Sequence, residues 1–212
     1  MSHDTLAAPE LAAIDIQGHT RQAFILKGAV AAGAVYGLAA VGPYVKAATA
    51  QEGGGDVEIL NFALTLEYLE TAYYTEGLKK TPGLTSDVKK LAKEIRGNEA
   101  AHVAALTKTI NDLGGKPVKA PMVDFGEAFA NQKSFLKLAQ TLEDTGVSAY
   151  NGAGPAIKNK DVLAAAGSIV QVEARHAAAI RLLNGQPISD GGFDKTLTVK
   201  QVLAAVKPFV KS

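Results

Sequence analysis

Two short stretches of the chain each place a glutamate and a histidine three residues apart. The first is Asn98-Glu99-Ala100-Ala101-His102, and the second is Val172-Glu173-Ala174-Arg175-His176. In a helix, residues at this spacing lie one above the other on a single face. A carboxylate oxygen and an imidazole nitrogen can therefore reach the same metal ion, although one such pair alone is weak evidence for a site.

A second matched segment precedes each of these pairs. Thr65-Leu66-Glu67 is followed by Tyr74, and Thr141-Leu142-Glu143 is followed by Tyr150, with seven positions from glutamate to tyrosine in both copies. We therefore predict a tandem repeat of a helical hairpin, with one glutamate on its first helix and Glu-x-x-His on its second. This is the ligand set of a dinuclear carboxylate site in a four-helix bundle. The predicted metal ligands are Glu67, Glu99, His102, Glu143, Glu173 and His176.

Apolar residues recur at three- and four-residue spacing from Asp56 onward, which predicts amphipathic helices. The predicted inward faces include Thr71 in the first helix, Leu113 at the end of the second and Leu183 at the end of the fourth. Glu70 is assigned to the neighbouring face of the first helix. We therefore expect it to flank the site without being a ligand.

Turn residues delimit these helices and indicate how they are connected. The first helix is predicted to end at Gly77 and Thr81-Pro82-Gly83. The third helix is predicted to end in the stretch from Asn151-Gly152 to Pro155. About 16 irregular residues follow Gly114, whereas neighbouring helices of a bundle are usually joined by roughly 2–8. The fold prediction is all-α: a four-helix bundle with a long crossover that makes helices 2 and 3 parallel. A short C-terminal helix is expected at Val199–Val206, capped by Thr198.

The physical argument for metal rests on four glutamates placed along apolar stripes. Burying an unpaired carboxylate costs several kcal/mol, and four together repel one another. No lysine or arginine shares those stripes; Lys93, Arg96, Lys108 and Arg175 fall on other faces. Two divalent cations would match the four negative charges, and the two histidines would add neutral nitrogen donors.

Composition excludes several other classes of protein. The 212 residues are 47% apolar and 20% charged with a net charge of +1. No stripe of basic residues interleaved with aromatics is present, so we expect no nucleic-acid partner. The chain has no cysteine, which excludes disulfides, thiol catalysis and iron–sulfur clusters.

The N-terminal segment, residues 1–50, has the layout of an export signal. A polar tail leads to the apolar stretch 23–45, then to the small-residue cleavage motif Ala48-Thr49-Ala50. Gln22 stands where a twin-arginine signal would have its second arginine, so the export route is left open. The alternative is an uncleaved membrane anchor, because 23–45 is nearly long enough to span a bilayer. We expect an exported protein of the periplasm or cell envelope, with residues 51–212 forming the bundle domain.

From Asp56 to Asn184 the chain resembles the ferritin-like superfamily, in particular exported ferritin-like domain proteins related to desiccation-related proteins. The resemblance implies a dinuclear iron centre, or alternatively manganese. Glu99 and Glu173 would bridge the metals, while Glu67 and Glu143 would be terminal ligands. It also implies that the Tyr74 and Tyr150 hydroxyls donate to carboxylates across the site, the alternative being plain core aromatics.

One departure from these relatives concerns the histidines. Many relatives carry an aspartate near Glu-x-x-His that orients the imidazole, but here Asn98 and Val172 precede the two glutamates. The groups that orient His102 and His176 are therefore left unassigned.

Two functional classes follow from these observations. One is a redox enzyme, a di-iron oxidase or ferroxidase, or a consumer of peroxide, with O2 or peroxide as its small-molecule substrate. The other is a non-catalytic stress or desiccation-related protein whose metal only stabilises the bundle. A homo-oligomer is compatible with either class, and the sequence does not decide whether one forms.

Overall fold

Five α-helices follow one another in the part of the chain that the computed structural model describes, residues 55–211. The predicted export signal or anchor lies outside these residues. Within residues 55–211, no helix combines the length and the apolar character needed to cross a membrane. The helices are α3 (Asp56–Lys80), α4 (Ser86–Asp112), α5 (Gln132–Ala153), α6 (Lys160–Leu183) and α7 (Val199–Val206).

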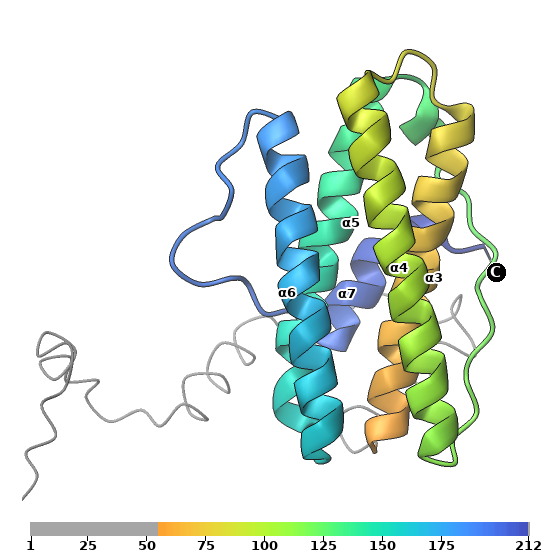
Figure 1. Cartoon of the computed structure of the whole chain (residues 1–212), viewed down its shortest axis with the longest axis vertical. Coiled ribbons are helices and arrows are strands. Elements are labelled where there is room, and N and C mark those ends of the chain that lie inside the picture. Colours follow the sequence, from red (N-terminus) through yellow and green to blue (C-terminus); the bar gives the residue numbers. More distant parts are fainter. Residues whose placement is uncertain (1–54, 212) are drawn as a thin grey trace, which may run out of the picture. The chain divides into compact units, whose positions relative to one another are not determined.

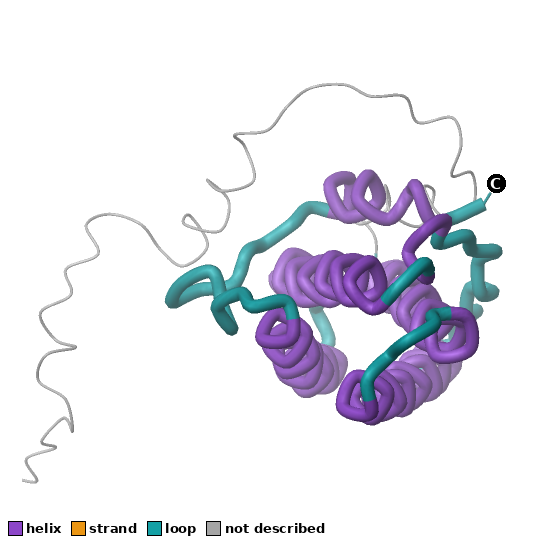
Figure 2. The backbone as a smooth tube through the Cα atoms, turned by 90° about the horizontal axis from the view of Figure 1, so that it is seen from above, coloured by secondary structure: helices purple, strands orange, loops and turns teal. Residues whose placement is uncertain are grey.

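The four long helices form two hairpins that pack side by side. Helix α3 pairs with α4 and α5 with α6, while α3 also contacts α5 and α4 contacts α6. Seen end-on, the four helices surround a common centre, and the short α7 lies outside them (Figure 2). Helix α7 packs against α5. The predicted all-α four-helix bundle with a short C-terminal helix is confirmed.

Side-chain caps fix where these helices begin. Thr85 accepts a hydrogen bond from the backbone of Val88 at the start of α4, and Asn131 forms a reciprocal capping box with Ser134 at the start of α5. Thr198 caps α7, as predicted. Such caps satisfy amide groups that have no partner within the helix.

The connection from α4 to α5 runs along the length of the bundle, so these two helices are parallel (Figure 1). Asn61 of α3 holds its first part, accepting from Val118 N at 2.8 Å and donating to Lys116 O at 3.1 Å. Its later part pairs with the C-terminal residues, where Asp124 N donates to Phe209 O at 2.9 Å. The predicted crossover is therefore held at both of its ends.

Two apolar clusters occupy opposite ends of the bundle core. One contains the aromatic group of Tyr73, Phe125 and Phe135 together with Ile95 and Ile180. The other is built on aliphatic side chains: Leu60, Leu64, Leu106, Ile110, Val162 and Ile169. On each long helix the predicted metal ligands fall between residues of these two clusters. The polar layer is therefore shielded from both ends.

Some details of the helix faces and ends differ from the prediction. Gly77 does not end α3 but lies within it, against the Phe135 ring, and Gly152 lies within α5 against Leu197 O. Both glycines serve close packing in place of turn formation. Leu113 and Leu183 are 39% and 42% exposed, because they stand at the helix ends, beyond the cover of the neighbouring helices.

The close approach at Gly77 gives a test of the packing. A Cβ at position 77 would overlap the Phe135 ring, which is fully buried and stacked on Tyr73. Gly77→Ala should therefore destabilise the protein by about 1–3 kcal/mol, the usual cost of overpacking. Denaturant unfolding measures this cost.

Gly97 supplies the matched control. It is an exposed glycine of α4 with open space around its Cα. Gly97→Ala should leave stability unchanged or raise it by up to about 1 kcal/mol. Equal stability of the two variants would contradict the packing assignment.

Candidate metal centre

The six predicted ligands lie in a single cluster at the middle of the bundle. Their donor atoms form two groups, each within 4.8 Å. The first group is Glu67, Glu99, His102 and Glu173, and the second is Glu99, Glu143, Glu173 and His176. All four carboxylates are 0% exposed, whereas His102 and His176 are 8% and 5% exposed. The structure thus brings the six residues together, while their binding of metal stays a prediction.

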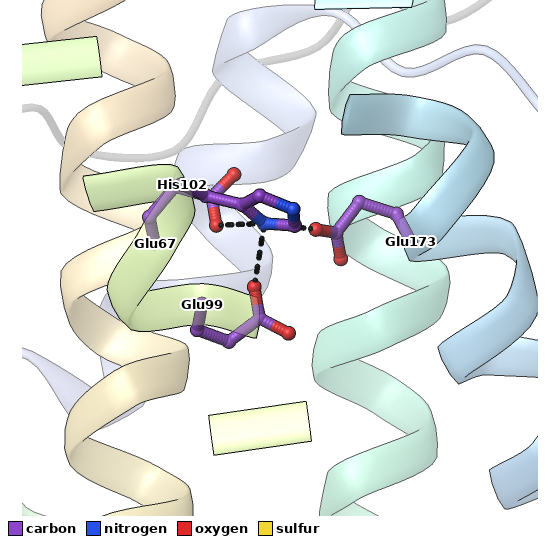
Figure 3. A group of neighbouring side chains, drawn as sticks. All are labelled: Glu67, Glu99, His102 and Glu173. Carbon is purple, nitrogen blue, oxygen red and sulfur yellow. Dashed lines mark hydrogen bonds and ion pairs between the residues drawn. The ribbon is translucent and has the colours of Figure 1, made fainter. Parts of the chain in front are cut away.

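The His102 imidazole faces three carboxylates at once (Figure 3). Its Nδ1 lies 3.1 Å from Glu67 Oε2, 2.9 Å from Glu99 Oε2 and 2.9 Å from Glu173 Oε1. A single N–H cannot satisfy three acceptors. Spacings near 3 Å are those expected of neighbouring ligands on one cation about 2.0–2.2 Å from each, the range of metal–oxygen and metal–imidazole bonds.

His176 stands in a similar position on the other hairpin. Its Nδ1 lies 2.9 Å from Glu99 Oε1, 3.5 Å from Glu143 Oε2 and 3.7 Å from Glu173 Oε2. Glu99 and Glu173 therefore each direct one oxygen toward His102 and the other toward His176. This is the orientation that a carboxylate shared by two cations requires.

Several buried atoms of the cluster have no hydrogen-bond partner. They are Glu99 Oε1, Glu143 Oε2, both Glu173 oxygens and His176 Nδ1. Buried polar atoms are normally paired, and an orphaned one has a cost. The short distances from histidine to carboxylate do not have the angles of hydrogen bonds at these atoms. Orphaned oxygens facing inward fit a pair of cations.

Two tyrosine hydroxyls hold the outer carboxylates. Tyr74 of α3 donates to Glu143 Oε1 of α5 at 2.5 Å, and Tyr150 of α5 donates to Glu67 Oε1 of α3 at 2.5 Å. Each bond crosses from one hairpin to the other, with the geometry that the resemblance implied. Each tyrosine leaves the second oxygen of its glutamate directed toward a histidine.

Asn98 supplies a contact that the sequence left unassigned. Its side-chain amide lies 3.0 Å from His176 Nε2. With Nδ1 directed at the carboxylates, Nε2 carries a proton and needs an acceptor, which the amide oxygen provides after a half-turn of the amide. The corresponding residue of the other hairpin is Val172, which has no polar side chain. The place of Asn98 directly before Glu99 was the sequence signal that could have predicted this contact with His176.

Glu70 lies deeper in the core than its predicted place on the neighbouring face of the helix. It is 3% exposed, whereas Thr71, which was assigned to the inward face, is only half-buried. Glu70 lies three residues after Glu67 and four before Tyr74. That spacing was the available signal that it shares their face.

Protons replace cations in the metal-free cluster. Burial opposes a charged imidazole, but the close approach of the surrounding glutamate carboxylates outweighs it and raises the pKa of both His102 and His176 to about 12. Burial and the Glu173 carboxylate raise the pKa of Glu143 to about 8. Burial likewise raises the pKa of Glu67 well above its usual value.

Glu99 differs from these outer glutamates. Burial alone would raise its pKa, yet the nearby imidazoles of His102 and His176 outweigh burial and lower the pKa to about 2. At neutral pH the metal-free cluster therefore holds protons on both histidines and on Glu143. Metal binding must release them.

Known proteins resemble this chain both in sequence and in fold. The sequence profile of the ferritin-like domain family matches residues 55–186. A crystal structure of ferritin-like, diiron-carboxylate proteins from Bacillus anthracis str. Ames is similar in fold, with a TM-score of 0.54 and 22% sequence identity. The match covers 60% of this chain and 94% of that one. No curated protein matches the chain.

The pKa shifts predict opposite effects of pH on the metal-free and metal-loaded protein. A folded-state pKa raised above its unfolded value contributes stability that is lost as pH rises through the folded value. For Glu143 this window runs from 4.5 to about 8, and for the histidines from 6.5 to about 12. The melting temperature of chelated protein should therefore fall between about pH 6 and about pH 9.

In the metal-loaded protein, divalent cations replace these protons. Affinity for Mn(II) should therefore increase over the same pH range, and binding should release protons into a weakly buffered solution. Chelation should also lower the melting temperature. Identical melting curves with and without metal, at both pH values, would show that these acids are not metal ligands.

Asn98 gives a second prediction, about orientation of an imidazole. Asn98→Ala should weaken metal binding at the position that includes His176 by about 10–100-fold, because groups that orient a ligand have effects of this size. Asn98→Asp, which keeps an acceptor, should retain most of the affinity. Titration with Co(II) measures both variants.

Asn111→Ala is the control, since Asn111 is an exposed asparagine on the same helix. It should bind Co(II) as wild type does. If Asn98→Ala also binds like wild type, the amide does not orient His176.

Proposed function

Because the chain belongs to the ferritin-like domain family, we propose that its buried cluster holds two metal ions and oxidises Fe(II) with O2 or peroxide. One observation supports this proposal above the others. The donor atoms form two overlapping groups that share Glu99 and Glu173. Two cations could therefore lie side by side on common carboxylates.

The residues divide between the two proposed metal positions. Glu67 and His102 would serve the first, and Glu143 and His176 the second, with Glu99 and Glu173 common to both. Four ionised carboxylates would then match the charge of two divalent ions. The tyrosine hydroxyls on Glu67 and Glu143 would hold those two carboxylates in place when the protons leave.

A pair of iron ions in such a site supplies two electrons to one oxidant molecule. The surrounding residues exclude bulk water, since the four carboxylates have no exposed surface. Only the imidazoles retain slight exposure, so a small oxidant would enter beside them, between α4 and α6. The charge of the proposed site comes from its carboxylates and metal ions alone, because the hydroxyls of Tyr74 and Tyr150 and the amide of Asn98 are neutral.

We propose iron over manganese because the similar solved structure is described as diiron-carboxylate. Carboxylates with two imidazoles accept either metal, so manganese with peroxide as substrate is the alternative. We also propose that the bundle acts outside the cytoplasm, on the basis of the export-like layout of residues 1–50. That location is an unsuitable place for bulk iron storage.

Anaerobic protein loaded with Fe(II) should develop ferric absorption on mixing with O2 or H2O2 faster than free Fe(II) does. Glu99→Gln removes a shared charge while keeping the shape of the side chain. It should return the rate to that of free Fe(II), while the helical circular dichroism is kept. Stopped-flow absorption measures the rate, and a Mn(II)-loaded sample tests peroxide consumption alongside.

Glu94→Gln is the matched control, because Glu94 is an exposed glutamate of the same helix. It should oxidise Fe(II) at the wild-type rate. If wild type binds both metals tightly but neither form reacts faster than the free ion, the metal has a structural role, as in the stress-protein alternative.

A further inference from the structure

A fifth buried carboxylate, that of Glu70, lies beside the proposed dinuclear site. Glu70 is 3% exposed, yet none of the hydrogen bonds or ion pairs found within residues 55–211 involves its side chain. A buried acid without a partner is costly, and no basic or donor side chain of residues 55–211 is paired with this one. Burial, then the Glu173 and Glu143 carboxylates, raise the pKa of Glu70 well above its usual value.

The Glu70 carboxylate packs closely against Gly146, where a larger residue would crowd it. A Cβ at Gly146 would lie 3.1 Å from Glu70 Oε1 and 3.6 Å from Glu173 Oε2. Gly146 is buried in the middle of α5, three residues after Glu143. The Glu70 carboxylate therefore points at the α5 backbone, next to an oxygen of the metal cluster.

Glu70 and Gly146 occupy equivalent positions in the two hairpins. Superposing the two hairpins in sequence places Glu67 on Glu143 and Tyr74 on Tyr150, and the same alignment places Glu70 on Gly146. One hairpin supplies an additional acid, and the other supplies the gap that admits it.

The orientation of Glu173 indicates which metal position Glu70 can reach. Glu173 Oε1 faces His102, while Oε2 faces His176. The oxygen near the Gly146 gap is Oε2, and Gly146 lies one turn from Glu143. Glu70 is therefore on the side of the Glu143 and His176 position. It lies outside the two groups of donor atoms, so rotation about its side-chain bonds must bring it to the metal.

We propose that Glu70 is a fifth carboxylate ligand, for the metal position formed by Glu143, Glu173 and His176, and that Gly146 provides the space for it. This inference rests on the proposed dinuclear site. Four carboxylates already balance two divalent ions, so a fifth favours an ion of higher charge at this position. The two positions are consequently unequal in affinity and in ligand number.

Titration of the whole chain with Co(II), followed by calorimetry and by visible absorption, tests the proposal. Wild type should bind two Co(II) ions. Glu70→Gln keeps the volume and removes the charge. It should bind the first ion as wild type does and the other about tenfold more weakly or worse, with altered Co(II) absorption bands.

Two further variants test whether Glu70 is a metal ligand or only an acid packed in the core. Glu76→Gln, on the same helix but outside the core and paired with Lys80, should titrate like wild type. Gly146→Ala, which pushes a methyl group against Glu70, should reproduce the loss of affinity. The double variant should bind Co(II) only slightly more weakly than either single variant, because both changes remove the same interaction. Gly146→Ala also carries the test if Glu70→Gln does not fold.

Identical two-site titrations for wild type, Glu70→Gln and Gly146→Ala would overturn the role of Glu70 while leaving the dinuclear site intact. Binding of fewer than two Co(II) ions by wild type would instead overturn the dinuclear site itself, and the role of Glu70 with it.

Discussion

The repulsion among buried carboxylates is the constraint on which the rest of this structure depends. Glu67, Glu99, Glu143 and Glu173 have no exposed surface, and no lysine or arginine pairs with them within residues 55–211. Several of their oxygens also lack any hydrogen bond. Isolated burial of this kind would cost several kcal/mol per charge. Only protons or cations can offset it, and the geometry provides for both: raised pKa values without metal, and two convergent donor groups with it.

The bundle is arranged around that polar layer. Apolar clusters at the two ends exclude water and thereby strengthen every interaction between charges in the layer. The crossover makes α4 and α5 parallel, which places the hairpins so that the tyrosine of one donates to the glutamate of the other. These reciprocal bonds hold the hairpins in register at the height of the site. A shift of one helical turn would break both of them.

The two halves are alike but not equal, and their differences fall on the same side. Asn98 contacts His176, whereas the equivalent contact to His102 would come from the apolar Val172. Glu70 lies by Gly146 and the Glu173 oxygen that faces His176. Both departures from exact repetition therefore concern one metal position. An approximately symmetric scaffold thus carries a site whose two positions differ in their surroundings.

The sequence by itself determined the hairpin repeat, most of the helical faces and the six residues that meet in the cluster, because helical spacing places i and i+3 residues on one face. The cap at Thr198 could also be predicted, because a cap depends only on residues close to it in the sequence. Only the tertiary structure decided the contacts between helices: Asn98 with His176, Gly77 against Phe135, and Glu70 beside Gly146. Each depends on the rotation of one helix relative to another. A change of a few tens of degrees moves a residue between neighbouring faces, and packing of the whole core sets that angle.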